Sequence, residues 1–299
     1  MASINELVVR SDFDGVWNRP DVGSKQFAKN YHAFIIGAIG ISKLTWNKVL
    51  EDAKATVRSE PEKHGWFIDG LNVTPVWADQ YQENKAFAAE SIRIINRSHI
   101  RTARRVPTEN ELPDFLNSAF QSAHSSIIAP PKPGAREAIK EIMRISDFGL
   151  VSNSETDNVR RGLRMIFKDD PDFADRIRVI GDAKKQKVNN EFASVVVNGR
   201  RVEIPVNLEL KGTTRKPLLR RQQFIETLVK EKAGVFIEDV AEYLYPPLVI
   251  GLHAILLKTK RTKGFELDYI ARHESNRGHV VEDLEGIVEQ VKKIKRRMK

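Results

Sequence analysis

Residues 7–15 read Leu-Val-Val-Arg-Ser-Asp-Phe-Asp-Gly. The apolar start predicts a buried strand, and the two aspartates come where that strand would end. Side chains two residues apart on an extended chain point the same way, so Asp12 and Asp14 can share one site while Phe13 points to the opposite face. Gly15 permits a sharp exit from the strand. The stretch therefore predicts either a pair of catalytic carboxylates or a polar turn, in which Asp and Gly are also common.

The composition is that of an ordinary soluble protein. The chain has 299 residues, of which 41% are hydrophobic and 30% charged, enough for one large domain or two smaller ones. The longest uncharged apolar run, residues 33–41, is much shorter than the roughly 20 residues that span a bilayer. There are no cysteines, and no basic segment followed by an apolar one opens the chain. We therefore expect a cytoplasmic protein with no membrane partner.

The formal charge of +9 is concentrated near the C-terminus. Residues 287–299 carry six basic side chains and one acidic one, a net of +5. Such a run is typical of a solvated helix end, where the helix dipole favours positive charge. The alternative is a patch for a polyanion such as nucleic acid, which we do not favour.

Residues 16–129 have the pattern of a helical domain. Helical periodicity runs over 46–58, 78–97 and 112–123. The proline-rich stretch 130–134 then interrupts the chain, which predicts a domain boundary or a hinge.

From residue 135 the pattern alternates between helices and short buried strands. The expected helices lie at 135–145, 157–167 and 220–232 and from about 281 onward, and the expected strands at 148–151, 178–180, 235–237 and 254–257. Between two valine-rich runs, Asn198-Gly199 predicts a β-hairpin. Short buried strands separated by helices predict an α/β fold with a parallel sheet covered on both faces.

Ligands of parallel sheets bind beyond the carboxyl ends of the strands. Four polar segments fall next to such places: Asp12 with Asp14, Ser152-Asn153-Ser154, Lys216-Pro217 ahead of a helix, and Glu238-Asp239.

In this order, the four segments resemble the motifs of the haloacid dehalogenase (HAD) superfamily of aspartate-dependent phosphohydrolases. The resemblance covers almost the whole chain outside the helical segment, and Pro133-Gly134 ahead of a helix supports it. It implies a Rossmann-like three-layer core formed by residues 1–17 and 132–299, with a hairpin insertion at about 185–211. The residues between, 18–131, would be an α-helical cap domain inserted between the first and second motifs.

The resemblance also implies a role for each polar residue. Asp12 would be the nucleophile that forms an aspartyl-phosphate, and Asp14 would act as general acid and then as general base. Ser152 and the backbone amide of Asn153 would bind the phosphoryl group.

The resemblance assigns the family's active-site lysine to Lys216, which would bind the phosphate with Ser152 and Asn153 and neutralise charge beside the nucleophile. Pro217 follows this lysine and a helix begins just beyond, as in the family pattern. Lys211, five residues earlier, is the alternative, because the hairpin insertion lengthens the route between the motifs.

Mg²⁺ is the expected cofactor, because carboxylates facing a phosphate need positive charge to offset their repulsion. The resemblance implies ligation by the Asp12 carboxylate, the Asp14 backbone carbonyl and Asp239, with Glu238 assisting directly or through water. Taken alone, Glu238-Asp239 is equally typical of an acidic helix start. The seven histidines show no metal-ligand spacing, and a Gly-x-Gly-x-x-Gly fingerprint is absent.

The expected function is that of a Mg²⁺-dependent phosphomonoester hydrolase acting on a small phosphorylated metabolite. An aspartate at position 14 favours phosphoryl transfer over dehalogenation, because the family's dehalogenases differ there. Two alternatives remain: a phosphatase of nucleotides or nucleic-acid ends, and a non-catalytic binding protein with the same fold.

Overall fold

The computed structural model describes residues 7–59, 78–125, 129–185, 187–209, 219–260, 262–273 and 275–298. The chain divides into two compact units. The core unit comprises Met1–Pro20 and Pro130–Lys299, and the helical unit comprises Asp21–Ala129. The boundaries expected from the sequence are 17/18 and 131/132.

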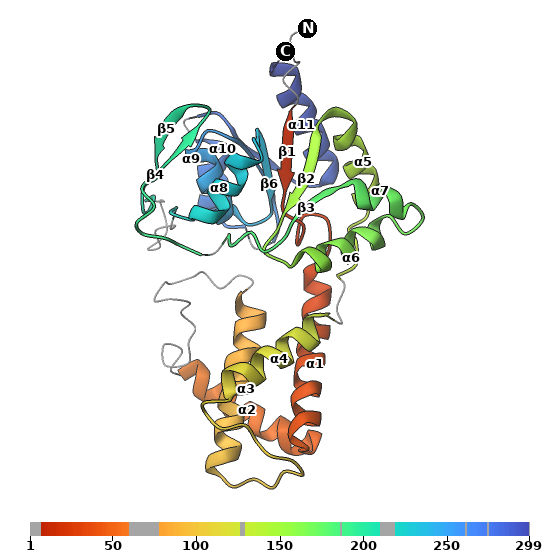
Figure 1. Ribbon diagram of the computed structural model, residues 1–299, viewed down its shortest axis with the longest axis vertical. Helices are drawn as coiled ribbons and strands as arrows, with labels where there is room; N and C mark the ends of the chain where they lie inside the picture. Colours follow the sequence, from red (N-terminus) through yellow and green to blue (C-terminus); the bar gives the residue numbers. More distant parts are fainter. Residues whose placement is uncertain are drawn as a thin grey trace. The chain divides into compact units, whose positions relative to one another are not determined.

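A parallel sheet forms the centre of the core unit. Over the described ranges it has six strands in the order β3-β2-β1-β6-β7-β8, with every neighbouring pair parallel. Figure 1 shows β1 between β2 and β6. The strands are β1 (Val8–Ser11), β2 (Asp147–Val151), β3 (Arg178–Ile180), β6 (Val235–Glu238), β7 (His253–Leu257) and β8 (Gly278–Val281). The first strand therefore lies in the interior of the sheet, between β2 and β6.

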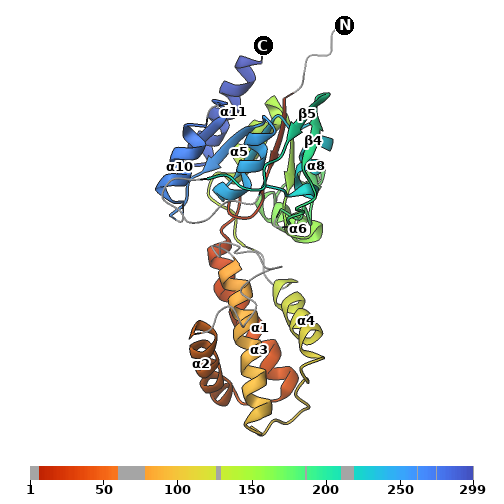
Figure 2. The same cartoon turned by 90° about the vertical axis from the view of Figure 1, so that its left-hand side faces the viewer.

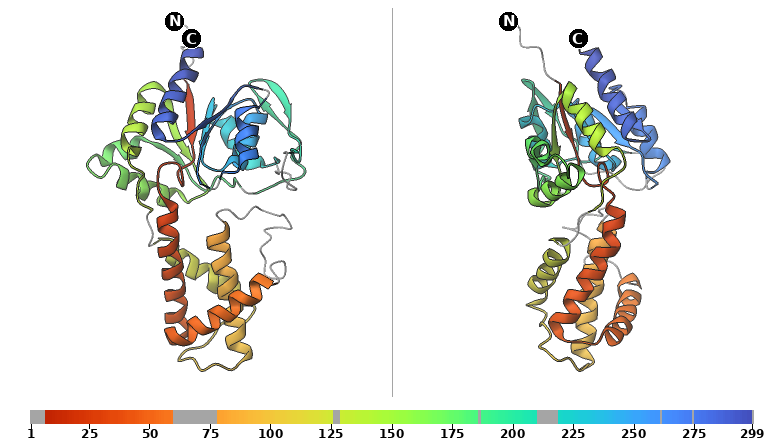
Figure 3. Two further views of the ribbon diagram at one scale, coloured as in Figure 1. Left: turned by 180° about the vertical axis from the view of Figure 1, so that it is seen from behind. Right: turned by 90° about the vertical axis from the view of Figure 1, so that its right-hand side faces the viewer.

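Helices cover both faces of this sheet. One face packs against α5 (Ala135–Ile145), α6 (Thr156–Ile166), α7 (Pro171–Arg176) and α11 (Leu284–Arg297). The other packs against α8 (Gln222–Lys230), the 3₁₀ turn η2 (Ala241–Tyr243), α9 (Tyr245–Val249) and α10 (Gly264–Ala271). Figure 3 shows α5 and α11 side by side on the first face. The predicted three-layer α/β fold is confirmed.

Side-chain alternation along the central strands distributes the core between the two layers. Val9 and Ile237 belong to the cluster of the first face, whereas Phe236, between Ile237 and Val235, belongs to the second. Because both faces are buried, β6 is apolar along its length until Glu238.

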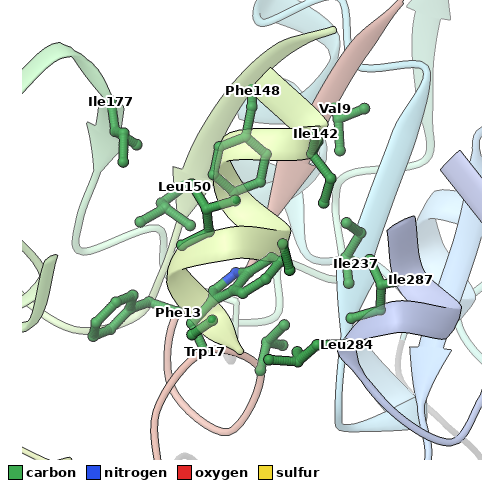
Figure 4. Packing of buried hydrophobic residues seen from close by; sticks show 14 of the residues in the cluster. Val9, Phe13, Trp17, Ile142, Phe148, Leu150, Ile177, Ile237, Leu284 and Ile287 are labelled. Carbon is green, nitrogen blue, oxygen red and sulfur yellow. The ribbon is translucent and has the colours of Figure 1, made fainter. Parts of the chain in front are cut away.

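Phe13 anchors the turn that carries the two aspartates. Its ring is buried in the first-face cluster, where Figure 4 shows it together with Trp17 and Phe148. A Cβ on Gly162 of α6 would come within 2.4 Å of the Phe13 ring, so the glycine makes room for it. Burying a phenylalanine contributes about 2 kcal/mol, which holds this turn against the first face of the sheet.

The end of the chain differs from the expected pattern. A helix from about residue 281 was expected, but Gly278–Val281 forms the edge strand β8, and α11 begins at Leu284. Asp283 caps this helix by accepting a hydrogen bond from Gly286 N at 2.8 Å. The strand is too short for a period to be recognised in the sequence, and pairing with β7 stabilises it.

The predicted hairpin is confirmed. Strands β4 (Ser194–Val197) and β5 (Arg200–Glu203) pair antiparallel. Asn198 and Gly199 between them have φ values of 50° and 77°, as a two-residue turn of this hand requires.

The helical unit has its own hydrophobic core. Its described helices are α1 (Pro20–Ile39), α2 (Lys43–Ser59), α3 (Ala78–Arg97) and α4 (Leu112–Ser125) (Figure 2). The core includes Phe27, Trp46, Ile92 and Leu116. Over the described residues no single helix is long and apolar enough to cross a bilayer. Taken together, the helical segments Gln26–Ile39 and Lys43–Val57 reach the required length and apolar composition, but the pair is bent by 117°.

The two chain segments that leave and re-enter the core unit lie side by side. Asn18 and Pro131 form an antiparallel bridge. Arg19 N donates to Pro130 O at 2.8 Å, and Lys132 N donates to Trp17 O at 2.9 Å. The insertion of the helical unit therefore leaves the core unit continuous in space.

Candidate active site

The candidate site lies at the carboxyl ends of β1, β2 and β6. Ser11 is in register with Ile237 of β6 and Leu150 of β2. Asp12 N continues the ladder by donating to Ile237 O at 2.9 Å. The side chains that follow these three strands consequently converge, as the parallel arrangement predicts.

Lys185, which lies in none of the four predicted motifs, is buried in this site. Lys185 Nζ lies 2.8 Å from Asp12 Oδ2 and 2.6 Å from Glu238 Oε2, and the residue is only 1% exposed. Burial by itself lowers the pKa of Lys185, but the charges of Asp12 and Glu238 outweigh it and raise the pKa above its usual value. Lys185 is therefore a fixed positive charge against the Asp12 carboxylate.

Glu238 is fully buried and bound on both oxygens. Oε1 accepts from Asp239 N at 3.0 Å and from Val240 N at 3.3 Å, while Oε2 accepts from Lys185. Burial, followed by the charge of Asp12, raises the pKa of Glu238 well above its usual value. In this arrangement Glu238 holds Lys185 and the turn that carries Asp239.

Asp239 completes a cluster of three carboxylates. One ligand oxygen from each of Asp12, Glu238 and Asp239 lies within 4.8 Å of the others. Burial raises the pKa of Asp239 to about 6. A Cβ on Gly15, whose φ is +79°, would come within 2.2 Å of Asp239 Oδ2, so only glycine fits here.

The cluster has the properties of a divalent-cation site. Among the described residues, the buried atom Asp12 Oδ1 has no hydrogen-bond partner, and its neighbours in the cluster are carboxylate oxygens. An unpaired buried carboxylate oxygen is costly unless a ligand satisfies it. Hard oxygen donors are those that Mg²⁺ prefers, so the residues present fit the ion.

The Asp14 carboxylate accepts hydrogen bonds from two neutral side chains. Asn18 Nδ2 donates to its Oδ1 at 2.7 Å, and Ser154 Oγ donates to its Oδ2 at 2.5 Å. The Asn18 amide also accepts from Gly15 N at 3.0 Å. These bonds hold the Asp14 carboxylate between the Asp12–Asn18 turn and the loop after β2.

The loop after β2 brings Ser152 and Asn153 to the site. Ser152 is buried, and its hydroxyl oxygen accepts from Ser154 N at 3.3 Å. Asn153 Oδ1 accepts from Lys185 N at 2.7 Å, so this side chain holds the lysine's backbone. Lys216 and Lys211, the two lysines expected from the sequence, lie outside the described residues.

A signal for Lys185 was present in the sequence. Residues that bind ligands in parallel sheets follow the strands, and residues 181–185 directly follow β3. Lys184 and Lys187 lie close by and are exposed, however, and no sequence pattern separates the buried Lys185 from them.

Lys132 brings a second cation close to the turn. Its Nζ donates to Gly15 O, and its charge acts on Asp239 to lower the pKa of that carboxyl, against the larger effect of burial. Lys132 comes from the segment that re-enters the core unit, so this segment also contributes to the electrostatics of the site.

No protein-family model and no curated protein matches the chain. Among solved structures, it is similar to a haloacid dehalogenase-like family hydrolase from Xanthomonas campestris, with 11% identity, a TM-score of 0.47, and coverage of 100% of this chain and 95% of that one. A predicted phosphoglycolate phosphatase from Haemophilus somnus shows 12% identity and a TM-score of 0.44, with coverage of 95% and 96%.

The putative HAD-hydrolase YfnB from Bacillus subtilis, in a structure bound to magnesium, shows 9% identity and a TM-score of 0.43, with coverage of 96% and 99%. At such low identities and TM-scores, these likenesses carry no information on substrate or on the roles of residues. The chain is thus similar in structure to haloacid dehalogenase-like hydrolases, the superfamily that its sequence motifs resemble.

Proposed function

We propose that this chain is a Mg²⁺-dependent phosphomonoester hydrolase of the haloacid dehalogenase type that acts on a small phosphorylated metabolite. The observation that carries the proposal is the environment of Asp12. This carboxylate is buried with one oxygen against Lys185 and the other without a hydrogen-bond partner among the described residues, next to Asp239.

In the first step, a carboxylate oxygen of Asp12 attacks phosphorus and the bond from phosphorus to the ester oxygen breaks. The product is an aspartyl-phosphate, and the leaving oxygen needs a proton. Carboxylates act as covalent nucleophiles in such transfers, and the covalent intermediate divides one difficult displacement into two easier ones. Lys185 supports this step because its charge offsets the negative charge that accumulates around Asp12.

Asp14 is the candidate acid and base. Protonated, it gives its proton to the departing ester oxygen; ionised, it then takes a proton from the water that attacks phosphorus. The bond from phosphorus to Asp12 breaks in that second step, which releases phosphate and restores the nucleophile. The hydrogen bonds from Asn18 and Ser154 support this role by holding the Asp14 carboxylate in one orientation.

Phosphoryl binding falls to the loop after β2. The Ser152 hydroxyl and the backbone amide of Asn153 would donate to phosphoryl oxygens. Lys216, which lies outside the described residues, is the third candidate for binding the phosphate.

Asp12 and Asp239 would hold Mg²⁺, with the Asp14 carbonyl as a further ligand and with Glu238 in direct or water-mediated support. When bound, the ion supplies positive charge that lets a phosphate anion approach a cluster of carboxylates. Two observations support this assignment: among the described residues Asp12 Oδ1 has no hydrogen-bond partner, and burial makes the charged form of Asp239 costly, which raises its pKa.

The test is a release screen with excess Mg²⁺ or with EDTA. Its substrates are sugar phosphates, nucleotides, 5′- and 3′-phosphorylated oligonucleotides, and 2-haloacids. We expect Mg²⁺-dependent phosphate release from one class of small phosphate esters and no halide release. Halide release without phosphate release, or no turnover of any ester, would refute the proposal.

A further inference from the structure

We infer that Arg221 and Tyr243 form a clamp that positions Lys185 in the active site. Neither residue belongs to the four sequence motifs, and each acts through the lysine. The inference rests on the proposed function, in which Lys185 holds the nucleophile, and it assigns that function two positioning residues.

The backbone around Lys185 lacks the support of regular structure. Lys185 follows β3 in an irregular segment, in which Asp182 and Lys184 adopt left-handed φ values of 53° and 50°. Such values are uncommon for residues other than glycine and persist only where surrounding contacts impose them. The position of Lys185 must therefore come from tertiary contacts.

Side chains from two other elements bind both backbone polar groups of Lys185. Asn153 accepts from its N–H at 2.7 Å, and Arg221 Nη1 donates to its carbonyl oxygen. In a helix or a strand, other backbone groups would make these bonds. Here Arg221, 36 residues away in the chain, takes over that task.

Arg221 occupies a place where its residue type is locally unfavourable. It is the N-cap of α8 and makes no side-chain capping bond. Ser, Thr, Asp and Asn stabilise that position, and the helix dipole disfavours a cation there. Local preference therefore does not explain an arginine, whereas its buried contacts with the Lys185 carbonyl and with Glu242 do.

The Tyr243 ring lies next to the charged groups of both Lys185 and Arg221. Lys185 Nζ and the Arg221 guanidinium carbon each lie 4.9 Å from the centroid of its ring. Cation–π attraction at buried sites contributes more than at exposed ones because water competes less. The ring thus favours the lysine conformation in which Nζ reaches Asp12 and Glu238.

Positioning matters because a lysine side chain has many rotamers and reaches its partners through a flexible stem. A displacement of about 1 Å in a reacting group can lower a rate about 100-fold. The clamp restricts the position of Lys185 at two places: Arg221 holds its backbone carbonyl, and the Tyr243 ring lies next to its ammonium group.

The experiment compares Arg221→Met with Glu231→Gln. Glu231 lies at the other end of α8, where it pairs with Arg10 and Arg178, so its variant removes a buried charge remote from Lys185. We expect both variants to unfold at lower denaturant concentration. Only Arg221→Met should also lower kcat, by about 10- to 100-fold.

A double-mutant cycle then separates positioning from general loss of structure. In single-turnover assays, adding Arg221→Met to Lys185→Met should change the residual rate less than about threefold, because the residue through which it acts is already gone. An undiminished effect of Arg221→Met in the absence of the lysine would overturn the inference.

Conservative replacement tests the ring. Tyr243→Phe keeps the aromatic face and should retain kcat within about threefold, whereas Tyr243→Leu should lower it about tenfold or more. Equal losses in the two variants would contradict the cation–π part of the clamp.

Amide hydrogen exchange gives a readout that does not require turnover. In the wild type, the amides of Asp182, Ala183 and Lys185 donate to residues 152–154. Arg221→Met should accelerate exchange over this segment about tenfold or more, and Glu231→Gln should not. Unchanged exchange in Arg221→Met would refute the clamp, whereas faster exchange in a protein without phosphatase activity would refute the proposed function alone.

Discussion

At the scale of the residue, charge balance governs the candidate site. Three buried or half-buried carboxylates lie next to Lys185, and burial raises the pKa of both Glu238 and Asp239. Removing a carboxylate and removing the lysine should therefore affect the electrostatic balance of the site in opposite ways. Loss of a carboxylate reduces repulsion, while loss of the lysine leaves buried negative charge without its counterion.

Asp12→Asn should abolish Mg²⁺-dependent phosphate release, with a loss of at least about 1,000-fold, because an amide is not a nucleophile for phosphorus. The fold should persist, since Lys185 keeps its ion pair with Glu238. Steady-state phosphate release and circular dichroism measure the two effects. Asp147→Asn is the matched control, because Asp147 opens β2 at the other end of the sheet; activity in Asp12→Asn equal to this control would contradict the nucleophile assignment.

Lys185→Met should lower the free energy of unfolding of the metal-free protein by about 3–5 kcal/mol, the usual result of leaving a buried ion-pair partner uncompensated. Urea denaturation in EDTA measures the change. Lys184→Met provides the control, because this neighbouring lysine is exposed and pairs with the nearby Asp182. If the two variants unfolded at the same urea concentration, the ion pairs of Lys185 would contribute nothing to stability.

At the scale of the element, the edge of the sheet contains a feature remote from the candidate site. His253 at the start of β7 and His279 of β8 lie with Nδ1 and Nε2 3.1 Å apart and with stacked rings. Burial first, and then neighbouring positive charge, lowers the pKa of each to about 4. The pairing of an edge strand with its neighbour is thus coupled to protonation.

The free energy of unfolding should therefore decrease as the pH falls from about 6.5 to about 4. In this window the unfolded chain binds protons at both histidines while the folded chain does not, so acid favours unfolding. Because the rings are only half buried, we expect about 1–2 kcal/mol for the pair after allowance for solvent screening.

Denaturation at several pH values compares the wild type with His253→Asn/His279→Asn, in which this part of the slope should disappear. Leu44→Ala, at an exposed position of the helical unit, changes no titratable group and should retain the wild-type slope. An identical slope in the double variant would show that the pair does not titrate in this way.

At the scale of the whole molecule, the two units have separate cores. The clusters on the two faces of the sheet contain only residues of the core unit, and the cluster around Trp46 contains only residues of the helical unit. The segments at 17–19 and 130–132 hydrogen bond to each other within the core unit. Each unit therefore has the packing of an independent folding unit.

Replacing residues 20–129 by a short Gly-Ser linker should leave a folded core unit. Arg19 N and Pro130 O are 2.8 Å apart, so a short linker can join the two chain ends without moving them. Cooperative urea unfolding with a near-ultraviolet circular dichroism signal is the expected result. The isolated segment 21–129 should likewise unfold cooperatively, and a core unit that showed no cooperative transition would contradict the division into independent units.

Local patterns were sufficient for much of the fold and for part of the site. The periodicity of α3 and α4, the Asn198-Gly199 turn and the apolar runs of β1 and β6 were each recognisable, because each depends on residues close together in the chain. Strand β8 was not recognised, since its stability comes from pairing with β7. Asp12, Glu238 and Asp239 could be placed together because each directly follows or ends a strand of one parallel sheet.

Lys185 belongs to the opposite case. Its segment has neither period nor motif, and its neighbours 184 and 187 are also lysines. What distinguishes it is burial against Asp12 and Glu238 and the contacts of Asn153, Arg221 and Tyr243. The order of residues was thus enough to establish the parallel sheet and the acidic side of the site, because strand ends and alternation are local properties. Folding alone selected the cation, because desolvation and long-range ion pairs exist only once distant segments are packed together.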